Sequence, residues 1–133
     1  MFRFGSLRLK YRVLRRKRRS ASLSSKARYK EHKETARELA LARLSHFNQF
    51  YGFDYKKIFI KNLKSRWGSC SKLQNLNFNY KIVFLSVELQ DYLIVHELCH
   101  LSEFNHSPKF WALVEKTIPN YKHARRELRR QRL

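Results

Sequence analysis

Three histidines and a glutamate with the spacing of a metal site lie between residues 92 and 111. Residues four apart share one face of a helix, so His96 and His100 can present two imidazoles to one cation, with Glu97 beside them. This H-E-x-x-H pattern is typical of zinc-dependent peptidases. The segment therefore predicts a site for one Zn²⁺ per chain on a helix.

The chemistry of such a site requires a third protein ligand and an open position. Catalytic Zn²⁺ is held by three protein ligands and leaves the fourth position to water, whose pKa falls to near neutral pH. Glu97 is placed to accept the proton of that water as a general base. The pattern thus indicates hydrolysis by an activated water.

Two residues compete to be the third ligand. Glu103 lies on the helix face of His96, but one further turn places it roughly 4.5 Å along the axis, which strains a tetrahedral arrangement. His106 becomes a ligand if the chain turns after about Phe104. Asn105 can end the helix, while Ser107 and Pro108 are typical of the N-cap and first position of the next one. We therefore favour His96, His100 and His106 as the metal ligands.

The surrounding pattern predicts helices and strands that support this site. Apolar residues recur every three or four positions from Ser24 to Tyr51, and Gly52 follows, so we expect a long helix there. A metal helix, apolar nearly all round, should begin after a Ser86 cap. Further helices are expected over 108–117 and 121–131. Strands are predicted at 7–13, 57–61 and 75–80, with turns at 67–70 and 72–75. Residues 82–85 are expected to be either a buried strand or the segment that enters the metal helix.

The charge distribution separates an N-terminal arm from the rest of the chain. Residues 1–30 carry twelve Lys and Arg and no acid, within a formal net charge of +20. We expect residues 1–23 to form a basic arm with an edge strand, and residues 24–133 to form one domain. The arm should bind polyanions, nucleic acid being the commonest, without sequence preference. The candidate contacts are Arg15, Arg16, Lys17, Arg18 and Arg19.

Length and composition favour a small cytoplasmic protein. At 133 residues with 43% hydrophobic content, the chain can bury one core. No apolar run approaches the roughly 18 residues that a membrane span needs, and the N-terminus lacks a secretory signal. Cys70 and Cys99 are too few and too far apart for a disulfide framework, so both are expected to be reduced, with Cys99 in the core.

Several sequence blocks, in order, resemble the bacterial YgjP-type metallopeptidase-like family, distant kin of the SprT-like zinc proteases. The resemblance runs from about Tyr29 to Leu128. It rests on Tyr29-Lys-x-His-Lys-Glu-x-Ala-Arg37, Lys64-x-Arg66-Trp-Gly-Ser-Cys70, Leu76-Asn-Phe-Asn-Tyr80, Asp91-Tyr-x-Ile-Val-His-Glu-Leu-Cys-His-Leu101 and Asn105-His-Ser-x-x-Phe-Trp111. The chain departs from the family after the Arg-rich strand, where Ser20–Ser25 leads almost directly into the helix.

The resemblance implies a zincin-like α+β fold: a long N-terminal helix on a small, mostly antiparallel sheet, a buried H-E-x-x-H helix and C-terminal helices. It also implies zinc on His96, His100 and His106, with Glu97 as the base, in agreement with the choice made from the residues.

Three functions fit these expectations. The leading one is a zinc metallopeptidase whose extended substrate pairs with a strand edge near 75–80. The second keeps the metal and cleaves nucleotide phosphoanhydrides, with Arg66 or the C-terminal arginines holding phosphate. The third is a basic nucleic-acid-binding module with a structural zinc, disfavoured because structural sites have four protein ligands and only three are evident.

Overall fold

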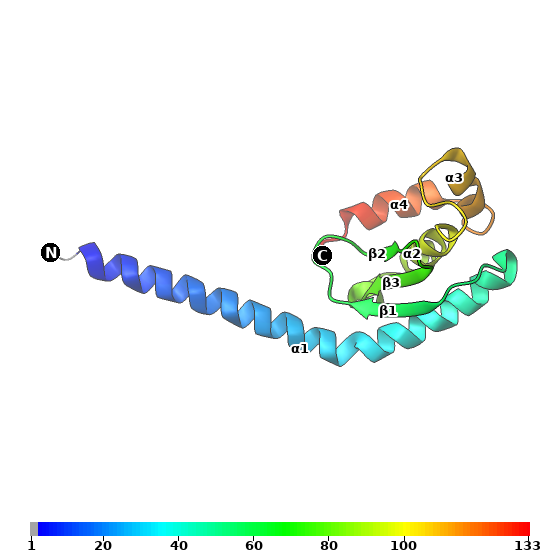
Figure 1. Ribbon diagram of the computed structural model, residues 1–133. Coiled ribbons are helices and arrows are strands. Elements are labelled where there is room, and N and C mark those ends of the chain that lie inside the picture. Colours follow the sequence, from blue (N-terminus) through cyan, green and yellow to red (C-terminus); the bar gives the residue numbers. More distant parts are fainter. Residues whose placement is uncertain (1–2) are drawn as a thin grey trace. The chain divides into compact units, whose positions relative to one another are not determined.

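The structure is a computed structural model that describes the backbone of residues 3–133 and the side chains of residues 24–133 (Figure 1). Two compact units divide the chain, one ending at Glu31 and the other formed by His32–Leu133. The element order is α1 (Arg3–Tyr51), β1 (Lys57–Lys61), β2 (Gly68–Cys70), β3 (Asn75–Asn79), the 3₁₀ helix η1 (Tyr80–Phe84), α2 (Val87–Cys99), α3 (Pro108–Glu115) and α4 (Tyr121–Arg130). The expected α+β class is confirmed.

The helix α1 is longer than the sequence predicted. It begins at Arg3, so the strand predicted at residues 7–13 is wrong, and Ser24, where the helix was predicted to begin, lies inside it. The alternating segment consists largely of Leu, Arg and Lys, which are good helix formers, and its apolar residues also recur four apart. The side chains of Arg15–Arg19 lie outside the described residues.

The C-terminal part of α1 supports the sheet and the metal helix. Its buried residues Ala36, Ala40, Leu44 and Phe47 recur three or four apart and are at most 6% exposed. Arg43 forms a two-pronged ion pair with Asp91 of α2, with N···O distances of 2.7 and 3.0 Å. Gly52 then ends the helix with φ +66°, a conformation that favours glycine, and its N–H donates to the Asn48 carbonyl at 2.8 Å.

The sheet has three strands in the order β1-β3-β2, with β1 parallel and β2 antiparallel to β3. It is therefore mixed, whereas a mostly antiparallel sheet was expected. The central position of β3 also means that residues 75–79 offer no free edge, which corrects the predicted substrate edge. The turn predicted at 67–70 is the outer strand β2, whose three residues are too few to show an alternating pattern.

The segment after the sheet leads directly into the metal helix. Residues 80–84 form a 3₁₀ helix that precedes α2, so the strand alternative for 82–85 is wrong. The Asn79 side chain accepts from the Lys81 N–H at 3.1 Å and caps this turn. Ser86 caps α2 as predicted, accepting from the Leu89 N–H. Nine residues of α2 are buried, which confirms an almost wholly enclosed helix. Within the described residues, no helix is long and apolar enough to cross a membrane.

Candidate metal centre

The helix α2 carries His96, Glu97 and His100, and side-chain contacts tie it to α1 and to the 3₁₀ segment that precedes it. Besides the Arg43–Asp91 ion pair, the buried Gln90 amide donates to the carbonyls of Ile82 and Leu85, each at 3.1 Å. Cys99 is fully buried, as predicted, and lies away from the cluster. The rigid helix thus positions two imidazoles one turn apart.

Three imidazole nitrogens converge on one point. The His96 Nε2 atom lies 3.2 Å from His100 Nε2 and 3.2 Å from His106 Nε2. The ligand atoms of the three histidines all lie within 4.8 Å of one another, and this is the only such group found among the described residues. Ligands at about 2.0–2.1 Å around a tetrahedral Zn²⁺ are separated by slightly more than 3 Å. The spacing therefore fits one such ion.

His106 reaches this point because the chain turns after α2. The helix ends at Cys99, earlier than the predicted end near Phe104, and His100 caps it. The next helix begins as predicted, with Ser107 as N-cap and Pro108 at its start. Glu103 does not join the cluster with its carboxylate; its backbone carbonyl lies 2.9 Å from His100 Nδ1. That contact leaves His100 Nε2 free to bind a metal.

Other neighbours of the histidines were not predicted from the sequence. The Tyr92 hydroxyl lies 3.2 Å from His96 Nδ1, Phe110 stacks on His100 at 4.4 Å, and Trp111 stacks on His106 at 5.8 Å between ring centroids. Tyr92 lies four residues before His96 in a helix, so this contact could have been predicted. The aromatic rings depend on how α3 packs and gave no comparable signal.

The three imidazoles are held in the neutral form that binds metals. Burial lowers the pKa of His96 to about 3, helped by His100, His106 and the positive charge of Arg125. Burial also lowers the pKa of His100 and that of His106. A cation at this point would thus meet imidazoles that have no proton to displace near neutral pH.

Glu97 is buried beside the cluster with an unsatisfied oxygen. The residue is 5% exposed, and its Oε2 atom has no hydrogen-bond partner in the structure. Burial raises the pKa of Glu97 to about 8, against an opposing effect of the Arg66 guanidinium. A buried carboxylate oxygen without a partner is costly, and a water beside the metal would satisfy it. The donor set and this oxygen fit a catalytic metal site.

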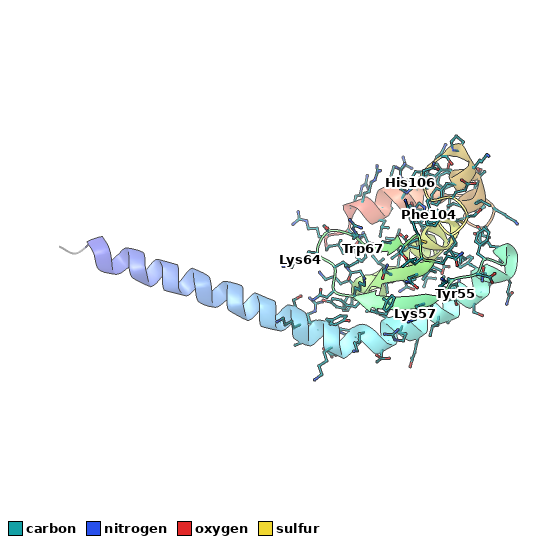
Figure 2. All side chains as sticks on the ribbon, viewed as in Figure 1. Tyr55, Lys57, Lys64, Trp67, Phe104 and His106 are labelled. Atoms are coloured by element: carbon teal, nitrogen blue, oxygen red, sulfur yellow. The ribbon has the colours of Figure 1, made fainter. Side chains whose placement is uncertain are left out.

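A cavity of about 390 Å³ opens onto His96, Glu97 and His106. Its walls come from β2 and the residues before it, including Trp67 and Gly68, and from α3 and α4 through Trp111, Arg125 and Arg129. Trp67 directly precedes β2 and His106 lies in the loop between α2 and α3 (Figure 2). The cavity is large enough for a few residues of an extended chain.

The arginines considered as phosphate contacts differ in position. Arg125 and Arg129 line the cavity, whereas Arg66, Arg126 and Arg130 do not. Arg66 is exposed, and its positive charge opposes the rise in the pKa of Glu97 that burial causes. The sequence of α4 did not indicate which of its arginines would line the cavity.

Comparisons with known proteins agree with this geometry. The family described as YgjP-like, metallopeptidase domain, matches residues 6–131. The crystal structure of the metallopeptidase zymogen abylysin of Pyrococcus abyssi is similar, with 28% identity, a TM-score of 0.62, and coverage of 70% of this chain and 96% of that one. The zymogen jannalysin of Methanocaldococcus jannaschii shares the fold at 24% identity and a TM-score of 0.55, with coverage of 70% of this chain and 92% of that one. No curated protein sequence matches significantly.

Proposed function

The chain belongs to the YgjP-like metallopeptidase family, and we propose that it hydrolyses peptide bonds with one Zn²⁺ held by His96, His100 and His106. The observation that carries this proposal is the combination of three convergent Nε2 atoms and the orphan oxygen of Glu97, beside a cavity that His96, Glu97 and His106 line. Among the residues that the structure describes, the cluster holds three histidines and no fourth ligand, which favours a catalytic over a structural site.

Zinc and Glu97 have different roles in the proposed hydrolysis. When bound, zinc supplies Lewis acidity that polarises the substrate carbonyl and acidifies water at the site. Glu97 accepts a proton from the attacking water at Oε2 and passes it to the leaving amine. Its pKa of about 8 would be lowered by the cation, which suits a base working near neutral pH.

The substrate is proposed to lie along the outer edge of β2. This strand pairs with β3 on one side only, and Gly68 brings its backbone to the cavity wall next to Glu97. An extended peptide can add to such an edge through main-chain hydrogen bonds, which tolerate many side chains. We therefore propose the edge of β2, and not the edge near residues 75–80, as the place where the substrate pairs.

The basic arm is proposed to bind nucleic acid without sequence preference. Arg15, Arg16, Lys17, Arg18 and Arg19 carry five positive charges in succession, and residues 1–30 contain no acid. Contacts to phosphate would keep the enzyme near nucleic-acid-bound proteins. The free thiols of Cys70 and Cys99 suit the reducing cytoplasm, where we propose that the protein acts.

Hydrolysis assays of the zinc-loaded chain test the proposed function. A denatured protein should be cleaved, nucleoside triphosphates should remain intact, and Glu97→Gln should show neither activity. Parallel reactions with single-stranded DNA ask whether nucleic acid alters the rate. Turnover of nucleotides without proteolysis would replace the peptidase by a phosphoanhydride hydrolase.

A further inference from the structure

Two arginines of α4 line the same cavity as His96 and His106, two of the three candidate metal ligands. Arg125 and Arg129 are four residues apart, so they lie on one face of the helix. Tyr92, His96 and Glu97 of α2 line the cavity as well. A substrate bound next to Glu97 would therefore occupy a cavity that Arg125 and Arg129 also line.

Arg125 is held in place by an aromatic stack. Its Cζ atom lies 4.9 Å from the centroid of the Trp111 ring. Trp111 in turn stacks on Tyr121 at 5.0 Å and on His106 at 5.8 Å between ring centroids. A guanidinium fixed over a ring loses little further freedom when it binds a planar anion. The arrangement connects Arg125, through Trp111, to the candidate metal ligand His106.

The two arginines of this cavity wall, Arg125 and Arg129, form no ion pair with the described side chains. Among the described residues, Glu97 is the only acidic one that lines the cavity. Arg130, on the same helix, differs because it pairs with Glu127 at 3.0 Å.

We propose that Arg125 and Arg129 form a specificity subsite that binds a carboxylate of the peptide substrate close to the scissile bond. The proposal rests on the proposed peptidase function and names its substrate class: peptides with an Asp or Glu side chain, or a free C-terminal carboxylate, at this position. Guanidinium and carboxylate match in shape and can form two parallel hydrogen bonds. Peptides with a basic residue there are repelled.

Binding to the Glu97→Gln variant tests the subsite without requiring hydrolysis. The two tryptophans of the chain, Trp67 and Trp111, both line the cavity, so tryptophan fluorescence reports its occupancy. The zinc-loaded variant is titrated with acetylated, amidated peptide pools in which one position is fixed as Glu, Gln or Lys. We expect the best Glu pool to bind about tenfold more tightly than its Gln counterpart, and the Lys pool most weakly.

A non-amidated Gln pool separates the two sources of the carboxylate. If only this pool gains affinity over its amidated form, the subsite binds the C-terminus; if the amidated Glu pool gains, it binds a side chain. Either result supports the subsite. Equal binding of all pools overturns it.

Matched variants on α4 assign the effect to the two arginines. Arg125→Gln with Arg129→Gln should abolish the preference, and Arg129→Glu alone, at an exposed position, should shift it towards the Lys pool. Arg126→Gln removes the same charge from an exposed residue outside the cavity and should leave the preference intact. Zinc content and circular dichroism check that each variant is folded.

Two results contradict the assignment. An unchanged preference in Arg129→Glu, or an equal loss in Arg126→Gln, would show that general charge and not the subsite selects the peptide. Failure of the wild type to cleave any peptide would refute the proposed function separately, since the binding assay does not depend on turnover.

Discussion

Gly68 lies so close to Glu97 that a Cβ atom added at position 68 would make unusually tight contacts with the Glu97 side chain. A Cβ atom there would lie 3.1 Å from Glu97 Cγ, 3.2 Å from Glu97 Oε1 and 2.9 Å from the backbone oxygen of Asn77. The glycine is thus needed for space and not for its backbone conformation. It lets the outer strand β2 lie directly against the proposed base.

Gly68→Ala should impair hydrolysis more than it impairs folding. The shortest contact of the added Cβ would be with the backbone oxygen of Asn77 in β3, so β2 must shift against β3 next to Glu97. Overpacking of this kind costs about 1–3 kcal/mol. Because a displacement of about 1 Å at a reacting group can cost on the order of 100-fold in rate, we expect a fall of that size in kcat/KM. Steady-state kinetics and thermal unfolding measure the two effects.

Gly52→Ala is the matched control for this change. Gly52 has φ +66° and no atom within 4 Å of an added Cβ, so alanine there should cost about 1–2 kcal/mol of stability through backbone strain alone. Its activity per folded molecule should equal that of the wild type. Equal kinetic losses in both variants would show that Gly68 matters only for stability.

Zinc binding should depend on three histidines and not on Glu103. His96→Ala, His100→Ala and His106→Ala each remove one of the three convergent nitrogens, so each should weaken binding by more than the roughly 10–100-fold typical of outer-shell changes. Glu103→Ala keeps the backbone carbonyl near His100 and should retain zinc. Metal analysis after dialysis gives the stoichiometry. Full zinc in His106→Ala together with loss in Glu103→Ala would reverse the choice of third ligand.

Glu97→Gln should retain the fold and the zinc but lose hydrolysis. The amide has the size of the carboxyl group, so the buried position is still filled, but it cannot accept a proton. We expect a decrease in kcat of about 10²–10⁴-fold, measured on the substrate that the wild type cleaves fastest. Turnover within a few-fold of the wild type would exclude Glu97 as the base.

The metal-free protein should lose stability between pH 5 and 8 because of Glu97. The pKa of Glu97 is about 8 in the folded state against an ordinary value of 4.5, so the folded state keeps a proton that the unfolded state loses. This stabilising contribution is complete below pH 4.5 and disappears as the pH rises to about 8. The Glu97→Gln variant lacks it at every pH.

Thermal unfolding of chelator-treated protein tests this expectation. Between pH 5 and 8, the free energy of unfolding of the wild type should decrease by a few kcal/mol relative to that of Glu97→Gln. This corresponds to a decrease in Tm of roughly 10 °C. The lowered pKa of His96 acts oppositely, since its stabilising effect is present above pH 6.5 and lost towards pH 3, but it is common to both proteins. If the Tm values of the two proteins change in parallel with pH, Glu97 is not held protonated.

The sequence predicted the parts of the site that depend on local spacing. The helix from the Ser86 cap through His96 and His100, and the turn at Ser107 and Pro108, follow from residues a few positions apart. The short strand β2 and the orientation of Arg125 could not be predicted in this way. Both depend on packing between segments distant in the sequence: β2 against Glu97, and α4 against Trp111 of α3.

The N-terminal arm shows how a short pattern can mislead. Residues 7–13 alternate in polarity, yet the same residues have high helix propensity and lie in α1. Seven residues are too few for the period to decide between strand and helix when local propensity opposes it. The charge of the arm, in contrast, is independent of its secondary structure.

The basic arm should determine affinity for nucleic acid. Changing Arg15, Arg16, Lys17, Arg18 and Arg19 to Ala removes five positive charges from consecutive residues of α1, while alanine preserves helix propensity. Because each phosphate contact releases a counterion, binding to single-stranded DNA should weaken by orders of magnitude, with a shallower salt dependence. Fluorescence anisotropy at several salt concentrations measures both effects, and hydrolysis of a small peptide should be unchanged.

A charge-preserving variant separates electrostatics from structure. Changing the four arginines of this segment to Lys keeps every charge and the helix propensity, so affinity should stay within a few-fold of the wild type. Sequence preference should be small in all three proteins, since phosphate contacts carry no base information. If the alanine variant loses thermal stability while its DNA affinity is unchanged, the charges of the arm serve the fold, and nucleic-acid binding by this segment is refuted.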